Sequence, residues 1–194
     1  MKKHIIEWLL SILIGIAVAF LINTFIFTRY TVSGSSMFPT FHDHDELIVN
    51  KLSVPLNKID RGDVIVFHAT KNKDYIKRLI GLPGDKVEYK EDNLYINDKY
   101  INESYLDTNK SNKSTKYLTE NFNVSDLKHA KNHQTIPKGK YLVLGDNRYI
   151  SNDSRKALGL VPKYKVIGKV SFRFLPLKDI QINFYPNSFN SIND

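Results

Sequence analysis

An apolar run near the N-terminus constrains this chain more than any other feature. From residue 8 to residue 22 every residue is apolar or small except Ser11, and Phe25, Ile26 and Phe27 extend the run. Twenty residues in a helix, at about 1.5 Å per residue, span about 30 Å, which is the thickness of a bilayer core. We therefore expect residues 8–27 to form a transmembrane helix.

The charges that flank this run predict its orientation. Lys2 and Lys3 precede it, and only Arg29 follows closely. The positive-inside rule then places residues 1–7 in the cytoplasm and the remainder of the chain outside. The alternative is a cleaved signal peptide, which needs small residues just after the apolar run. Ala17 and Ala19 have that spacing but lie inside the run, so an uncleaved anchor is favoured.

Length, cysteine content and charge narrow the remaining possibilities. A chain of 194 residues suits one domain, or a core domain with a smaller insertion. The absence of cysteine excludes a disulfide scaffold, a thiolate zinc site and a cysteine nucleophile. The net charge of +8 is spread along the chain without long runs of like charge. This pattern favours a basic face near anionic lipid and argues against a nucleic-acid partner.

Beyond residue 30 the sequence predicts a mainly β fold, with short β-type runs separated by Gly, Pro, Asn and Asp. The predicted strands cover residues 47–50, 63–68, 75–80, 86–89, 94–96, 141–144 and 166–174. Residues 107–135 contain few large apolar residues and are expected to form a surface excursion. We therefore expect a core domain in two parts, 30–85 and 139–185, a smaller β and loop insertion, 86–138, and a frayed tail, 186–194.

The predicted strand at residues 75–80 carries a base on each of its two apolar faces. The period-2 alternation places Lys77 in the middle of one face and Arg78 in the middle of the other. Burial would lower the pKa of Lys77, because desolvation disfavours the charged ammonium. The alternatives are that Lys77 extends to water or pairs with an acid.

A serine-rich turn at residues 33–40 follows the apolar run closely. Gly34 permits a sharp turn, and Pro39 restricts the chain just after the hydroxyl groups. A serine nucleophile needs a base, and no histidine here has the setting of one in a Ser-His-Asp triad. A neutral lysine is the natural alternative, although most serine-rich turns are purely structural.

Four ordered motifs connect these features to a known family. They are Ser-Met-x-Pro-Thr at 36–40, Gly-Asp-Val-Ile-Val-Phe at 62–67, Tyr-Ile-Lys-Arg-Leu-Ile-Gly-x-Pro-Gly-Asp at 75–85, and Gly-Asp-Asn-Arg-x-x-Ser-x-Asp-Ser-Arg at 145–155. With the apolar run, they resemble the type I signal peptidases in content and order, from residue 5 to about residue 175. The chain looks like the small, single-anchor form of Gram-positive bacteria.

The resemblance implies a serine endopeptidase with a Ser/Lys dyad. Ser36 would be the nucleophile and Lys77 the general base. Ser151 would hydrogen-bond the Lys77 ammonium and orient it, and Asp153 and Arg155 would form an ion pair that braces the site.

The resemblance also implies an oxyanion hole beside the nucleophile. The Ser36 backbone N–H would be one donor. Gly34 stands where Gram-negative relatives place a serine hydroxyl, so the second donor stays open.

The implied substrates are secretory preproteins that emerge from the export machinery at a bacterial cell membrane. Their signal peptides would be cleaved after small residues in an Ala-x-Ala-like pattern. The substrate would lie extended along an edge strand, and the reaction would pass through an acyl-enzyme. Membrane lipid is a further expected partner, and no cofactor is expected.

Two polar sites and two other protein classes are the alternatives to this interpretation. His42 and His44 lie among three acids, but a polar turn explains them as well, so no metal site is predicted. Asp146 is expected to have a structural role in its turn. The rival classes are a tethered β-domain that binds without catalysis, which should lack Ser36 or Lys77, and a self-cleaving regulator, which should carry a DNA-binding domain.

Overall fold

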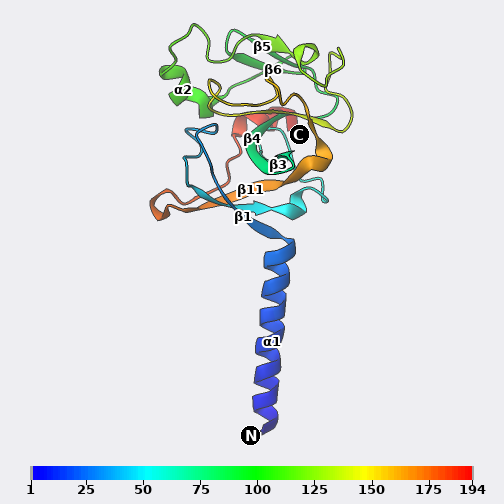
Figure 1. The fold of residues 1–194 in the computed structure, drawn as a ribbon, viewed down its shortest axis with the longest axis vertical. Helices are drawn as coiled ribbons and strands as arrows, with labels where there is room; N and C mark the ends of the chain where they lie inside the picture. The colour runs from blue at the N-terminus through cyan, green and yellow to red at the C-terminus, as the bar shows by residue number, and fades with distance from the viewer. Residues whose placement is uncertain (1, 194) are drawn as a thin grey trace.

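The computed structural model describes residues 2–193, apart from the side chains of residues 2, 3, 5 and 21–23. Helix α1 (Lys2–Phe25) projects from a β-rich body that contains the rest of the chain (Figure 1). Its described apolar side chains are exposed, including Trp8 at 73% and Phe20 at 68%. Within the described part of the chain, no helix combines enough length with enough apolarity to cross a membrane.

The membrane-spanning segment predicted for residues 8–27 stays a prediction, and its C-terminal bound is wrong. Helix α1 ends at Phe25, and Phe27 begins strand β1 (Phe27–Thr31), where it pairs with Asn50. Hydropathy alone continues the run through Phe27, whereas pairing with a distant strand ends it earlier. The Lys2 and Lys3 side chains, on which the predicted orientation depends, lie outside the described residues.

The larger of two sheets contains eight strands, and all of its pairings are antiparallel. Strand β1 stands at one end of the order, and the short strand β12 (Gln181–Ile182) pairs with β11 beside the main path. From β1 the order continues through β2 (Glu46–Asn50), β11 (Val166–Leu175), β3 (Val64–Thr70), β4 (Lys73–Gly81), β9 (Lys140–Leu144) and β10 (Val161–Pro162).

The smaller sheet is formed entirely within residues 86–138. Its order is β7 (Lys99–Ile101), β6 (Asn93–Ile96), β5 (Val87–Lys90) and β8 (Phe122–Asn123), and it lies at the end of the body away from α1 (Figure 1). Short helices are α2 (Asp107–Ser111) and α3 (Asn190–Asn193). Single 3-10 turns cover Lys51–Ser53, Ser104–Leu106, Val124–Asp126, Lys163–Lys165, Leu177–Asp179 and Asn187–Phe189.

The prediction of a mainly β fold is confirmed, and all seven predicted strands are present within two residues of their expected ends. The prediction missed the short strands β1, β7, β8, β10 and β12. Four of these strands have only two or three residues, so their pairing partners define them, and β1 directly follows the apolar run that predicts a helix through residue 27.

Two segments expected at the surface contribute to the core instead. Leu118, Val124 and Leu127, within the predicted surface excursion at 107–135, are buried in the largest apolar cluster or beside it. The predicted frayed tail is also wrong, because Phe189 is 0% exposed and its ring packs against Gly62. In both segments the average composition is polar, but the few apolar side chains are the ones that fold inward.

Candidate active site

Ser36 lies in a turn that directly follows β1. Gly34 has a φ of +85°, a left-handed conformation that glycine adopts without strain, and its N–H donates to Asp43 Oδ1 at 2.7 Å. The Ser36 carbonyl accepts from the Asn147 N–H at 3.0 Å, and the Phe41 N–H donates to the Met37 carbonyl at 3.0 Å. The turn therefore holds Ser36 from both sides.

Lys77 reaches this serine from the middle of β4, whose backbone pairs with β3. Its Nζ donates to Ser36 Oγ at 2.6 Å and to the Ile76 carbonyl at 3.0 Å, and it lies 5.3 Å from the centre of the Tyr75 ring. The residue is only 3% exposed. The structure therefore excludes the alternative that Lys77 extends to water.

Burial also changes the acidity of this lysine. Desolvation lowers the pKa of Lys77 to about 8, although the negative charges of Asp153 and Asp146 partly oppose the effect. A lysine with this pKa is partly neutral at ordinary pH, and only the neutral amine can accept a proton. Lys77 is thus chemically suited to be a base toward Ser36.

The other base of this strand is paired with an acid. Arg78 is 1% exposed, and its guanidinium donates to both carboxylate oxygens of Asp146, at 2.6 and 3.0 Å. Thr40 Oγ1 donates to the same carboxylate at 2.5 Å. The carboxylate of Asp146 is therefore occupied by the ion pair and by the hydrogen bond that joins it to the Ser36 turn.

The segment between β9 and β10 brings the remaining predicted residues to the site. A Cβ at Gly145 would collide with Ser151 Oγ and with the Ser36 carbonyl oxygen, so the close approach requires glycine. The predicted hydrogen bond from Lys77 to Ser151 is absent among the described residues. Lys77 Nζ is directed to Ser36 Oγ and to the Ile76 carbonyl instead, and the buried Ser151 hydroxyl lies beside the Asp153 carboxylate, where it helps to lower the pKa of Asp153.

Asp153 and Arg155 form the ion pair that the resemblance implies. Arg155 Nε and Nη2 donate to the two carboxylate oxygens at 2.9 and 2.8 Å, and the Gly145 N–H adds a bond of 3.0 Å. Burial alone would raise the pKa of Asp153, but the hydrogen bonds and charge of Arg155 outweigh it and lower the pKa. The buried carboxylate is therefore charged at neutral pH.

Sequence patterns predict no role for three residues that make contacts near the site. Arg148 pairs with the buried Glu103 at 2.6 Å, and its Nε donates to the Gly145 carbonyl at 3.0 Å. The side-chain amide of Asn109 donates to the carbonyls of Phe38 and Asp146. Arg148 belongs to the fourth motif, whereas Glu103 and Asn109 lie in polar stretches without any motif.

The acids around His42 and His44 have other partners. Asp43 accepts from the Gly34 N–H as well as lying 3.2 Å from His44 Nε2, and Asp45 pairs with Arg173 at 2.9 Å. Across the residues that the structure describes, no group of three or more His, Cys, Asp or Glu side chains is arranged to hold a metal ion.

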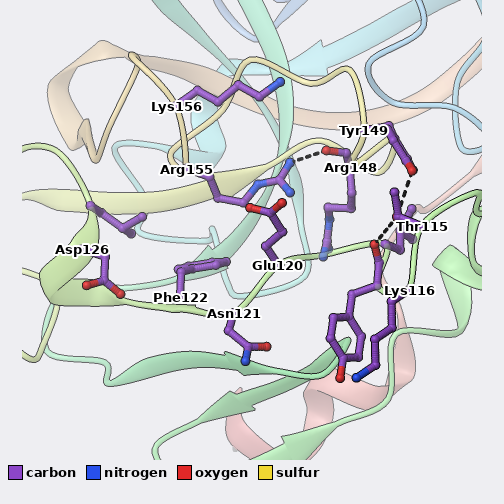
Figure 2. A pocket seen from close by; sticks show the side chains of 13 residues that line it. Thr115, Lys116, Glu120, Asn121, Phe122, Asp126, Arg148, Tyr149, Arg155 and Lys156 are labelled. Atoms are coloured by element: carbon purple, nitrogen blue, oxygen red, sulfur yellow. Dashed lines mark hydrogen bonds between the residues drawn. The ribbon is translucent and has the colours of Figure 1, made fainter.

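Two cavities border this region. One of about 290 Å³ contains the Ser36–Lys77 pair, and its walls are residues 30–33 and 36–37 on one side and 74–77 on the other, with Ile150 and Asn152. Another of about 480 Å³ is lined in part by residues 148, 149, 155 and 156, and Figure 2 shows Arg155 directed to the Arg148 carbonyl there. The larger cavity includes neither Ser36 nor Lys77 in its lining.

Comparison with known proteins agrees with this geometry. The family model "Signal peptidase, peptidase S26" matches residues 5–175. Signal peptidase IB of Staphylococcus aureus (strain MRSA252) is 48% identical over 189 residues, 97% of this chain and 98% of that protein. Signal peptidase I of Bacillus amyloliquefaciens is 46% identical over 176 residues, which are 90% and 88% of the two chains.

A solved structure shows the same similarity. The crystal structure of a signal peptidase I from Enterococcus faecalis V583 has a TM-score of 0.53 and 42% sequence identity, and the match covers 58% of this chain and 97% of that chain. With a family match over most of its length and relatives of nearly half identity over almost all of it, this chain belongs to the signal peptidase family, peptidase S26, and is a serine peptidase of the signal peptidase I type.

Proposed function

We propose that this chain is a membrane-anchored endopeptidase that removes signal peptides from secretory preproteins with a dyad of Ser36 and Lys77. The observation that carries the proposal is the 2.6 Å contact between Lys77 Nζ and Ser36 Oγ in a site where the lysine is buried. The names of its relatives, signal peptidase I and IB, support the substrate class.

In the acylation step, neutral Lys77 accepts the proton of Ser36 while Oγ attacks the scissile carbonyl carbon. The oxyanion of the tetrahedral intermediate is stabilised by the Ser36 N–H. When the C–N bond breaks, the Lys77 ammonium returns the proton to the amine of the mature protein, which leaves. Lys77 then takes a proton from water as the water attacks the ester carbonyl carbon. When the bond between that carbon and Ser36 Oγ breaks, the Lys77 ammonium returns the proton to Oγ, and the signal peptide leaves with a free carboxyl group.

Other residues support these two groups. Asp153 and Arg155 brace the segment that follows β9, and their two short contacts favour this role. Ser151 accepts a hydrogen bond from the Lys77 ammonium when that ammonium forms, because its buried hydroxyl keeps acceptor lone pairs while its hydrogen faces the Asp153 carboxylate. Gly34 borders the oxyanion hole, because it is two residues before the nucleophile and leaves open space where a Cβ would stand.

The cavity beside the dyad favours small side chains in the substrate. Its volume is about 290 Å³, and its lining includes Val32, Met37 and Ile76, so small apolar residues in an Ala-x-Ala-like pattern suit it. Strand β1 stands at one end of the large sheet and leads directly to the Ser36 turn. An extended signal peptide emerging from the export machinery would lie along such an edge strand.

The apolar part of α1, from Trp8 to Phe25, anchors the chain in a bacterial cell membrane, with residues 1–7 in the cytoplasm and the catalytic part outside. The exposed apolar side chains of α1 support this arrangement, because large apolar surfaces require lipid or protein to cover them. Residues 30–85 and 139–185 form the catalytic core, and 86–138 form the insertion that contains the smaller sheet. Carbonate extraction and protease protection of cells that express the chain test the anchor and its orientation.

The decisive experiment is cleavage of a preprotein by the full chain in detergent micelles. Ser36→Ala and Lys77→Ala should each abolish cleavage, whereas the matched controls Ser35→Ala and Lys73→Ala should retain it. Ser35 is the adjacent exposed serine, and Lys73 is an exposed lysine on the same strand as Lys77. Turnover within about twofold of the parent by either dyad variant would exclude this mechanism.

A further inference from the structure

Two segments, far apart in sequence, meet at the dyad. One is the turn at residues 35–41, which carries Ser36, and the other is the segment 145–155, which carries Asp153. They are joined directly by the Asn147 N–H, which donates to the Ser36 carbonyl at 3.0 Å, and by Thr40 Oγ1, which donates to Asp146 Oδ2 at 2.5 Å. The relative position of these two segments therefore determines the position of Ser36 Oγ.

A third residue, from outside both segments, bridges them. Asn109 Nδ2 donates to the Phe38 carbonyl at 2.8 Å and to the Asp146 carbonyl at 2.9 Å. Both partners are carbonyl oxygens, which only accept, so the NH₂ group of the side chain must face them. Its two hydrogens match the two acceptors, one on each segment.

The segment that carries Asn109 is anchored to the protein core. It lies in α2, which follows Glu103 and the buried Leu106 closely (Figure 1). Glu103 Oε1 accepts from Arg148 Nη2 at 2.6 Å and from Tyr89 OH at 2.7 Å, in surroundings without solvent access. The start of the 103–111 stretch is therefore fixed to the core through buried charge-assisted bonds.

We propose that Asn109 is a positioning residue for the reaction, and that its amide fixes the Ser36 turn against the 145–155 segment. The inference rests on the proposed Ser36–Lys77 chemistry. The smaller-sheet region thus contributes a group to the active site without contacting the substrate. A displacement of about 1 Å in a reacting group can cost about 100-fold in rate.

The bridge acts on the turnover step more than on substrate binding. Phe38 is two residues after Ser36, so a shift of its carbonyl moves the Ser36 N–H and Oγ together. Asn109 does not line the cavity beside the dyad, so its loss removes no direct contact with the bound peptide. The expected signature is a lower kcat with an almost unchanged KM.

The test compares Asn109→Ala and Asn109→Asp with the control Asn112→Asp in the full chain. Asn109→Asp keeps the shape but places an acceptor against two acceptors, and Asn112 is an exposed asparagine three residues later. We expect kcat to fall about tenfold or more in both Asn109 variants, with KM within about twofold, and the control to match the parent. The variants are assayed well below their unfolding temperatures, and if Asn109→Asp does not fold, Asn109→Ala decides.

Two further measurements separate positioning from other roles. In Asn109→Ala the pH midpoint of kcat/KM should stay at the parent value, because a neutral group is removed and Lys77 keeps its surroundings. Folded Asn109→Ala with kcat within twofold of the parent, or a loss confined to KM, would overturn the proposal. Cleavage by the parent and its loss in Ser36→Ala are established first, so that failure of the dyad mechanism is recognised separately.

Discussion

Replacing Lys77 with methionine should stabilise the fold at neutral pH while it abolishes the reaction. Burial lowers the pKa of Lys77 from 10.5 to about 8, so the folded state binds the proton less tightly than the unfolded state does. Below pH 8 the lysine is protonated in both the folded and the unfolded state, so the buried charge lowers the unfolding free energy by its full amount. Between pH 8 and 10.5 the cost declines, and above that range it disappears.

The lowered pKa gives the size of this effect. At pH 7 the cost of the protonated lysine is about 3 kcal/mol of unfolding free energy, and at pH 10 it is below about 1 kcal/mol. Methionine is unbranched and apolar, so it fills similar space without the charge. The hydrogen bonds of Lys77 Nζ to Ser36 Oγ and the Ile76 carbonyl are lost at either pH, and the difference between the two pH values therefore isolates the charge.

The assay is urea denaturation of the detergent-solubilised chain at pH 7 and at pH 10. The gain of Lys77→Met over the parent should be about 2 kcal/mol larger at pH 7 than at pH 10. Lys73→Met is the matched control, since Lys73 is exposed on the same strand, and it should show no such dependence. A gain that is equal at the two pH values would refute the argument that Lys77 is held against its charged form.

Three further outcomes follow from the same contacts. With the neutral amine of Lys77 as the proposed base, kcat/KM should rise about tenfold from pH 7 to pH 9 and then level off; a rise that continues past pH 10 would contradict this proposal. Glu103→Gln leaves the buried Arg148 without its counter-charge and should lower the unfolding free energy by about 3 kcal/mol or more, measured in urea. Phe189→Ala removes a fully buried ring and should cost about 3 to 5 kcal/mol in the same measurement.

The two stability predictions have matched controls in the chain. Asp98→Asn, which removes the exposed ion pair of Lys86 and Asp98, should leave the unfolding free energy unchanged within the error of the measurement, because water and salt screen such a pair. Asn190→Ala changes an exposed neighbour of Phe189 and should stay within about 0.5 kcal/mol of the parent. If Phe189→Ala lowers the unfolding free energy no more than Asn190→Ala does, the C-terminus is not part of the core.

The longer strands and the pairing of Ser36 with Lys77 could be predicted because their signals lie in residues that are close together in the sequence. Strands such as β4 and β11 are long enough to show a period, so their extent follows from residues that are close together in the chain. Lys77 is distinctive in the sequence because a basic residue interrupts an apolar face of the predicted strand at 75–80. The family resemblance that the ordered motifs carry associates it with Ser36. The short strands lacked such local signals, since a run of two or three residues is defined only by its partner.

The same limit explains the errors at the chain ends and in the polar stretches. Phe27 continues the apolar run, but its pairing with Asn50 ends the helix before it. Phe189 is a single aromatic residue in a polar tail, and only packing against Gly62 shows that it is buried. Asn109 is one of several asparagines in its stretch, and nothing local distinguishes it.

The sequence by itself therefore determined the apolar N-terminal run, the mainly β class, the family and the pair of Ser36 and Lys77, because composition, period and motif order are local properties. Only the tertiary structure decided that Lys77 is buried within 2.6 Å of Ser36 Oγ and that Asn109 bridges two distant segments. It also showed that Lys77 Nζ is hydrogen-bonded to Ser36 Oγ and the Ile76 carbonyl and not to the buried hydroxyl of Ser151. Burial and hydrogen bonding depend on which distant segments meet, and a pKa shift follows only after they have met.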